Sequence, residues 1–371
     1  MNAKVPIARS CITTTKRDAS SATWDRPHGA GKTTEGKHDE CRPELTVEIS
    51  TRSGRRTGFC NCLCLIAELA AGLQMFIAGK QPMKKLIEVV QEAGRNCVAI
   101  GHFNIADLVI LKGVFEAARE LKVPVMVGAS EGEREFAGTR QLAAVVRSLR
   151  EEFDFPIFLN ADHTHSLAKG IEAVKAGFDS IVFDLSTLPL EENARSTKQA
   201  VESLKSINPE VVVEGEIGDI GSGSEIHAEV ARPDRTLTIP EEARQFVAET
   251  RVDVLAPAVG NSHGMQKSMV TGKERKHLAI ERIREIKSAT CVPLTLHGGS
   301  GTADEDLKRA IRAGVNVVHI NTEVRLAWKH GLEAGLSRRE DEVVPYKILP
   351  SAVAAVHDLV SARLRLFGGQ G

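Results

Sequence analysis

Eight short runs rich in valine, isoleucine and leucine recur between Lys84 and the C-terminus, and this recurrence constrains the fold more than any other feature. Segments with helical periodicity separate the runs. Continuous apolar runs are typical of parallel strands whose faces are covered on both sides. Eight such units in roughly 240 residues match the size of a closed barrel. The sequence therefore predicts an α/β fold, a (β/α)8 TIM barrel, with strands at 98–105, 123–130, 156–162, 180–186, 211–218, 252–260, 292–300 and 315–322.

An open, doubly wound sheet is the alternative architecture for this pattern. In that fold a glycine-rich turn follows the first strand, whereas no such turn follows residues 98–105. Residues 344–367 add one more helical segment after the eighth unit. We expect this added C-terminal helix to pack on the barrel or on a partner subunit.

Residues 1–80 differ from this pattern, and we expect them to form a poorly structured, flexible N-terminal extension to a barrel domain at 81–371. They are rich in Ser, Thr, Arg and Lys, and no period is sustained before the cysteine-rich run at 60–64. The stretch HGAGKTTEG resembles a phosphate-binding loop but has Arg26 where that motif has glycine. A presequence, or a true start at Met83, is the other interpretation.

Composition argues against several classes of partner. The net charge is −1 and aromatic residues make up 4% of the chain, so neither charge nor base stacking favours nucleic acid. The apolar stretch at 59–79 contains Glu68 and does not predict a membrane helix. Most of the seven cysteines precede residue 65, which leaves the barrel too few for a disulfide framework. The expected location is the cytoplasm, and the expected partner is a small molecule.

Polar residues interrupt the apolar runs at their C-terminal ends, where barrels of this kind carry their active sites. His163 follows the third run, His263 the sixth, and His297 lies in the seventh. A single histidine at a strand end is usually structural, but three at equivalent places predict a catalytic zinc site with an open fourth position. Asp184 and Glu216, from the fourth and fifth runs, are predicted to orient the imidazoles or to hold a second metal ion.

Asp162 lies beside His163 and is not needed for a three-histidine site, so it is the best-placed general acid/base. None of the eight runs contains a lysine, which favours a metal ion over a Schiff-base lysine for carbonyl chemistry. His102, His165, His227 and His319 receive no ligand role. We expect His165 to point elsewhere and His319 to pack structurally.

Glycine-rich turns adjoin the predicted metal site. The turn at 298–301 precedes the helical segment 302–314, so its N–H groups lie at a helix N-terminus, which favours anions. The eighth run ends nearby in Asn321 and Thr322. Barrels often bind phosphate with the loops after strands seven and eight. A metal ion beside a phosphate site indicates a reaction on a phosphorylated carbonyl compound.

These residues fall in motifs that resemble a known family. ADHTHS, IVFDLSTLP, VEGEIGDIG, GNSHGM, LHGGSG and HINTEVR resemble, in order and spacing, the motifs of class II fructose-bisphosphate aldolases and the related tagatose-bisphosphate aldolases. The resemblance runs from about residue 84 to the C-terminus. It implies a metal-dependent aldolase that cleaves or forms a ketose bisphosphate, with fructose 1,6-bisphosphate as the first candidate. Tagatose bisphosphate or another ketose phosphate is the alternative substrate.

Carried over position by position, the resemblance implies a catalytic Zn²⁺ bound by His163, His263 and His297. A second divalent or a monovalent cation is implied as a further ion, and Asp184 and Glu216 match residues near an alternative or second metal position. Asp162 matches the family's acid/base, which acts at the aldehyde oxygen when the C3–C4 bond is cleaved.

Substrate contacts and assembly are implied in the same way. A mobile loop after the fifth strand supplies a glutamate for the C3 proton in this family, and Glu225 is the first candidate here, with Glu229 second. Ser130 matches a contact to the phosphate of the aldehyde half. The family also implies a homodimer or homotetramer. The positions matched to dihydroxyacetone phosphate are Gly264, Gly298, Gly299, Ser300, Asn321, Thr322, Glu323 and Val324.

Two other functions compete with the aldolase hypothesis. A metal-dependent sugar-phosphate epimerase also combines histidine and carboxylate ligands with phosphate turns, but it needs two opposed acids across the substrate. A barrel that binds sugar phosphate without catalysis is the non-enzyme alternative. Release of triose phosphate distinguishes an aldolase from the epimerase. Any turnover excludes the non-catalytic barrel.

Overall fold

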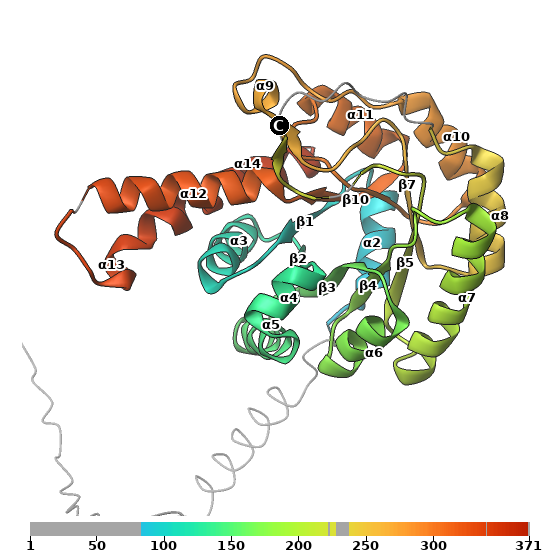
Figure 1. Cartoon of the computed structure of the whole chain (residues 1–371), viewed down its shortest axis with the longest axis horizontal. Helices are drawn as coiled ribbons and strands as arrows, with labels where there is room; N and C mark the ends of the chain where they lie inside the picture. Colours follow the sequence, from blue (N-terminus) through green and yellow to red (C-terminus); the bar gives the residue numbers. More distant parts are fainter. Residues whose placement is uncertain (1–82, 222, 228–236, 339, 370–371) are drawn as a thin grey trace, which may run out of the picture. The chain divides into compact units, whose positions relative to one another are not determined.

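The computed structural model of this protein describes residues 83–221, 223–227, 237–338 and 340–369. Eight parallel strands within these ranges close into a barrel, which confirms the predicted TIM fold (Figure 1). Each predicted run overlaps one strand, and only β3 extends past its run, by two residues beyond the predicted end at 162. The strands are β1 (Ile100–Asn104), β2 (Val125–Ala129), β3 (Ile157–Thr164), β4 (Ser180–Phe183), β5 (Val212–Ile217), β7 (Val254–Pro257), β9 (Leu294–Leu296) and β10 (Val315–Ile320).

The barrel order is β1-β10-β9-β7-β5-β4-β3-β2. Two very short strands, β6 (Ile226–His227) and β8 (Met265–Gln266), pair with each other outside the barrel. They join the loop after β5 to the loop after β7. This pairing matters for function because the two loops follow strands whose C-terminal ends carry predicted site residues.

Helices surround the barrel in Figure 1. Residue types typical of helix ends begin and end several of them: Asp107 caps one N-terminus by accepting a hydrogen bond from the Ile110 amide, and Gly177, at φ 102°, ends another. The helices are α2 (Leu86–Arg95), α3 (Leu108–Leu121), α4 (Glu131–Ala137), α5 (Thr139–Phe153), α6 (Leu167–Ala176), α7 (Leu190–Ile207), α8 (Pro240–Thr250), α9 (Lys267–Val270), α10 (Ile280–Thr290), α11 (Asp304–Ala313), α12 (Thr322–Ser337), α13 (Pro345–Ile348) and α14 (Pro350–Phe367).

Helix α2 closes the N-terminal end of the barrel. Its buried side chains recur at positions 86, 89, 90 and 93, the spacing of one helix face. This face packs on the inward-pointing side chains at the beginnings of the strands, and together they form a separate small core. Its barrel members are Ile100, Met126, Phe158, Val212, Val254 and Val317.

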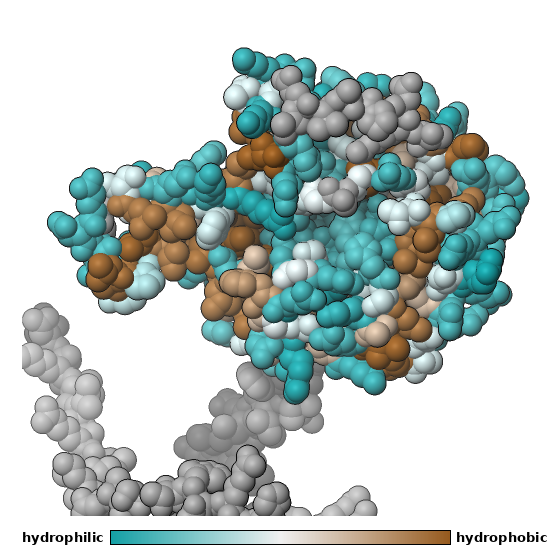
Figure 2. All heavy atoms as spheres, viewed as in Figure 1, coloured by the Kyte–Doolittle hydropathy of each residue, from teal (hydrophilic) through white to brown (hydrophobic). Residues whose placement is uncertain are grey.

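The predicted C-terminal helix is confirmed and is part of a larger addition. Helix α14 packs against α3 and α12, and α12 and α13 extend away from the barrel as a projecting arm (Figure 1). Figure 2 shows hydrophobic residues gathered on this arm. Among its exposed side chains are Leu336, Val343 and Tyr346, which are 50%, 84% and 75% exposed.

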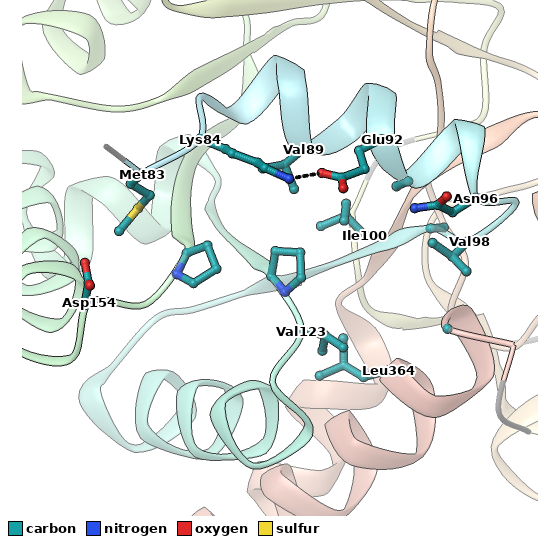
Figure 3. Close-up of a pocket in the computed structure, with 15 residues that line it drawn as sticks. Met83, Lys84, Val89, Glu92, Asn96, Val98, Ile100, Val123, Asp154 and Leu364 are labelled. Atoms are coloured by element: carbon teal, nitrogen blue, oxygen red, sulfur yellow. Dashed lines mark hydrogen bonds and ion pairs between the residues drawn. The ribbon is translucent and has the colours of Figure 1, made fainter. Parts of the chain in front are cut away.

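A cavity of about 480 Å³ lies at the N-terminal end of the barrel, beside α2 and the segments that lead into β1, β2 and β3 (Figure 3). Val89, Ile100 and Leu364 contribute apolar surface to it, and an ion pair joins Lys84 to Glu92 across 2.5 Å. Barrel active sites lie at the opposite, C-terminal end of the strands. This cavity is therefore distinct from the candidate site described next.

The predicted extension at residues 1–80 lies outside the described residues, as do the HGAGKTTEG stretch and the cysteine-rich run. Within the described ranges, no helix is both long and apolar enough to cross a membrane.

Candidate active site

The three predicted metal ligands converge at the C-terminal end of the barrel. Nitrogen atoms of His163, His263 and His297 and a carboxylate oxygen of Glu216 all lie within 4.8 Å of one another. The ring centroid of His163 lies 4.6 Å from that of His263 and 4.8 Å from that of His297. Residues up to 134 positions apart in the chain therefore share one small volume.

Two carboxylates set the orientation of the imidazoles. Asp184 Oδ2 lies 2.8 Å from His163 Nδ1, and Glu214 Oε1 lies 2.6 Å from His297 Nε2. The remaining nitrogens, His163 Nε2 and His297 Nδ1, face each other across 3.2 Å. Tetrahedral zinc with Zn–N bonds of about 2.0–2.1 Å separates its nitrogen ligands by about 3.4 Å. The spacing of these two nitrogens therefore fits two ligands of a tetrahedral ion, and His263 lies within 4.8 Å to complete the set.

A backbone irregularity brings two adjacent residues into the site. Successive side chains of a strand point to opposite faces, so Asp162 and His163 could not both face the site on a regular strand. The register of β3 with β4 shifts between Ala161 and Thr164, and His163 adopts φ 40°. A left-handed conformation at a non-glycine residue costs on the order of 1–3 kcal/mol and is found preferentially at functional sites.

The electrostatics of the cluster favour a cation. Burial disfavours a charge on His163, but the carboxylates of Asp162, Asp184 and Glu216 raise its pKa to about 10. Burial raises the pKa of Glu216 well above its usual range, and its Oε2 atom is buried without a hydrogen-bond partner. Burial and the neighbouring His163 lower the pKa of His297 to about 3. A divalent ion would replace the single charge on His163 and satisfy the buried carboxylate.

Glu214 lies on β5, two residues before Glu216, and was not assigned a role from the sequence. Its Oε1 atom contacts His297, and its Oε2 accepts a hydrogen bond from Thr295 Oγ1 at 2.6 Å. The alternation of strand residues places both glutamates on the inner face, and this was the signal available in the sequence.

Glu214→Gln is expected to weaken zinc binding by about 10–100-fold, because the neutral amide no longer holds the His297 imidazole with a charged acceptor. Competition with a chromophoric chelator measures the change. Glu202→Gln, an exposed position on α7, is the matched control. Equal zinc affinity in the two variants would contradict the orienting role.

Asp162 lies beside the metal group, as predicted. Its Oδ2 accepts a hydrogen bond from Asn104 Nδ2 at 2.8 Å, and His319 Nδ1 lies 3.5 Å from its Oδ1. Burial alone would raise the pKa of Asp162, but His163 and His319 hold it well below the usual range. Asp162 is therefore ionised at neutral pH, as a group that removes a proton must be.

The expectation that His319 only packs structurally was incomplete. His319 lines the pocket beside Asp162, and its ring stacks on His102 at 3.5 Å and on His297 at 4.1 Å. The prediction that His165 points elsewhere is consistent with the structure, because its side chain is 58% exposed. Only the closed barrel brings β1 and β10 side by side, so the histidine stack could not be read from the sequence.

The glycine-rich turns adjoin the metal group. Gly264, Gly298, Ser300 and Asn321 line the same pocket as His163. Gly298 has φ 61°, and a Cβ atom there would lie 2.2 Å from the Ser262 carbonyl oxygen, so the turn requires glycine. The Asn321 Oδ1 atom is buried without a hydrogen-bond partner. An unsatisfied acceptor at a pocket wall suits a ligand hydroxyl.

The other residues predicted to bind substrate lie at the C-terminal end of the barrel, but not all of them line the pocket. Thr322 also lines the pocket. Gly299 donates its amide to His319 O, and the Glu323 carboxylate accepts from the Gly301 amide and pairs with Arg363. The Val324 side chain is fully buried in the core, which leaves only its backbone for a ligand contact.

The two predicted residues on loops are less closely tied to the cluster. Ser130 caps α4 by accepting a hydrogen bond from the Glu133 amide. Glu225 is exposed on the loop after β5, and its carbonyl oxygen accepts from the Met265 amide. Glu229, the second candidate for the loop glutamate, lies outside the described residues. The roles of Ser130 and Glu225 remain predictions.

Comparison with known proteins identifies relatives of the whole barrel. Residues 84–371 match the family described as fructose-bisphosphate aldolase class II. The fructose-bisphosphate aldolase of Thermus caldophilus is 33% identical over 306 residues, covering 77% of this chain and 98% of that protein. The sulfofructosephosphate aldolase of Alkalicoccus urumqiensis is 31% identical, covering 76% of this chain and 95% of that protein.

A solved structure agrees with these sequence relatives. The YdjI aldolase from Escherichia coli K12 superposes with a TM-score of 0.65 at 28% identity, covering 77% of this chain and 98% of that chain. The family match at residues 84–371 includes the strand ends that carry His163, His263 and His297. This chain therefore belongs to the class II fructose-bisphosphate aldolase family and is an aldolase of the ketose-phosphate type.

Proposed function

We propose that this enzyme is a zinc-dependent aldolase that cleaves a ketose bisphosphate, with fructose 1,6-bisphosphate as the preferred substrate. The products would be dihydroxyacetone phosphate and an aldehyde phosphate. The observation that carries the proposal is the convergence of His163, His263 and His297 with Glu216 inside 4.8 Å, beside a glycine-rich turn. This combination suits a substrate with a carbonyl group and a phosphate group on one fragment.

The three histidines would hold the zinc ion, and Glu216 lies within reach as a further ligand. When bound, the ion supplies Lewis acidity toward the ketose carbonyl oxygen. Asp162 removes the proton of the C4 hydroxyl as the C3–C4 bond breaks, and it returns this proton to the aldehyde oxygen in condensation. The electron pair of that bond stays with C3, which then takes up a proton. We assign this last transfer to Glu225 on the loop after β5.

The phosphate of the dihydroxyacetone half would bind at Gly264, Gly298 and Ser300, and its hydroxyl groups would reach Asn321. Helix α11 begins shortly after this turn, so its N-terminus adds a favourable dipole for an anion. Ser130, at the end of β2, is proposed for the phosphate of the aldehyde half.

Steady-state kinetics with a triose phosphate readout test this function. We expect cleavage of fructose 1,6-bisphosphate to be abolished by prolonged chelation and restored by Zn²⁺. Tagatose 1,6-bisphosphate and 6-deoxy-6-sulfofructose 1-phosphate are the comparison substrates, because they change one stereocentre or the distal anion. Cleavage that survives complete metal removal, or inactivation by borohydride in the presence of substrate, would contradict the zinc mechanism.

We also propose that the enzyme assembles as a homodimer or homotetramer through the arm formed by α12 and α13. Its exposed Leu336, Val343 and Tyr346 form an apolar surface that a second copy would cover. Sedimentation velocity of the purified chain tests this assembly, and a monomer at micromolar concentration would contradict it.

A cytoplasmic location is proposed because Cys97 and Cys291 are both free and exposed thiols, which persist in reducing compartments. Fractionation of the source cells tests the location, and recovery from an oxidising compartment would overturn it.

A further inference from the structure

Lys276 is a buried lysine behind the glycine-rich turns of the active site. Only 1% of the residue is exposed. Its Nζ atom lies 2.6 Å from the Ser262 carbonyl oxygen, 2.7 Å from that of Gly264 and 3.0 Å from that of Gly298. Lysine is almost never fully buried unless its charge is compensated. The three carbonyl groups contribute to that compensation.

The geometry also defines the chemical form of the side chain. Three carbonyl oxygens are acceptors only, so each contact needs a hydrogen from nitrogen, and only the ammonium form carries three. An ammonium that donates to three carbonyls has no lone pair to attack a ketose carbonyl. Lys276 is therefore placed as a fixed positive charge and not as a Schiff-base nucleophile.

The backbone around Lys276 is joined to the turn after β9. The Lys276 amide donates to Gly301 O at 2.9 Å, the Ala303 amide donates to Lys276 O at 3.1 Å, and a parallel bridge joins Lys276 to Thr302. From this anchored position the side chain reaches both histidine loops. Ser262 and Gly264 flank one zinc ligand in sequence, and Gly298 follows another.

The charge also affects the pocket in front of the turns. Carbonyl oxygens that converge at one point carry partial negative charge and would repel a phosphate group. Gly264 and Gly298 contribute two of these carbonyls and also line the pocket proposed to bind phosphate. The full positive charge of the ammonium opposes this repulsion, and its effect reaches further in a partly desolvated site because Coulomb interactions there are stronger than in water.

We propose that the Lys276 ammonium is a built-in cation of the phosphate-binding site. It acts as a positioning residue that fixes the loops of His263 and His297 relative to each other. It also supplies the positive charge with which the turns at Gly264 and Gly298 bind the substrate phosphate, a part that rests on the proposed ketose-phosphate activity. The enzyme then needs no monovalent cation from solvent at this position.

Phosphate binding and cation dependence test the proposal. The full chain, Lys276→Ala, Lys276→Met and the control Lys273→Met, an exposed lysine three residues away, are compared in buffer whose only monovalent cation is tetramethylammonium. Calorimetry with inorganic phosphate, on zinc-loaded and zinc-free protein, measures binding without catalysis. Kinetics give kcat and KM, and thermal unfolding reports whether each variant is folded.

Lys276→Ala is expected to weaken phosphate binding and raise KM by at least about tenfold, the effect of one lost charged hydrogen-bonding group. Added ammonium or potassium ions should restore much of both, because the cavity left by alanine accepts a small cation. Lys276→Met should show the same loss without rescue, since its side chain fills the space. The wild type and Lys273→Met should not respond to either cation.

Several outcomes would overturn the proposal. These are unchanged phosphate affinity in a folded Lys276→Ala variant, or a loss of affinity that no cation restores. A wild-type rate that rises severalfold with potassium would also overturn it, and this measurement holds even if both variants fail to fold. A wild type that binds phosphate through Lys276 but cleaves no ketose phosphate would support the built-in cation and refute the proposed function.

Discussion

His297→Ala is expected to lose bound zinc and turnover together, with kcat/KM reduced by more than about a hundredfold. Loss of a residue that orients a metal ligand typically costs about 10–100-fold, and loss of the ligand itself should cost more. Two changes add up at this position. The imidazole nitrogen that faces His163 across 3.2 Å disappears, and Glu214 loses its partner at 2.6 Å. The metal content by atomic absorption and the rate of triose phosphate release measure the two losses.

The barrel itself should stay folded in this variant. His297 follows β9 at the C-terminal end, whereas the core at the N-terminal end is formed by α2 and the beginnings of the strands. Circular dichroism should therefore match the wild type. His330→Ala, an exposed histidine on α12, is the matched control and should retain zinc. Full zinc content and full activity in His297→Ala would remove this residue from the metal site.

Asp162→Asn is expected to keep zinc and lose turnover, with kcat reduced by about 10²–10⁴-fold, the contribution of a positioned general acid/base. The amide keeps the shape of the side chain and can still accept the hydrogen bond from Asn104, but it cannot remove a proton. Because the pKa of Asp162 lies below the usual range, the wild-type group is ionised at neutral pH, and the loss should be seen there.

Measuring zinc content and kcat on the same preparation of this variant distinguishes a role of Asp162 in proton transfer from a role in holding the metal site. Asp358→Asn, whose side chain is 82% exposed on α14, is the control for a carboxylate-to-amide change. If Asp162→Asn loses zinc as well as turnover, the role of Asp162 is to hold the metal site together. KM should change little, because the substitution leaves the phosphate turns untouched.

The barrel could be predicted because its information is local. Each run of buried β-branched residues, followed by a segment with helical periodicity, specifies one βα unit. Eight consecutive βα units match the known size of a closed barrel. The histidines at 163, 263 and 297 could be chosen because a closed barrel brings all strand ends to one rim. These predictions required the order of elements but no side-chain geometry.

The partners of those histidines depended on tertiary contacts. Asp184 was expected near the metal, but its pairing with His163 is visible only in three dimensions, as is the pairing of Glu214 with His297. The shifted register of β3 and the positive φ of His163 reflect a balance between local strain and many distant contacts. No local pattern in residues 157–164 predicts it.

The amino-acid sequence alone determined the number of βα units, the rim on which chemistry occurs and the residue types that meet there, because periodicity and strand order are properties of the chain. The tertiary structure alone decided which carboxylate holds which imidazole, how His319 reaches Asp162, and why Lys276 is buried. Those contacts join residues far apart in the chain, and their energies arise only when burial removes water from both partners.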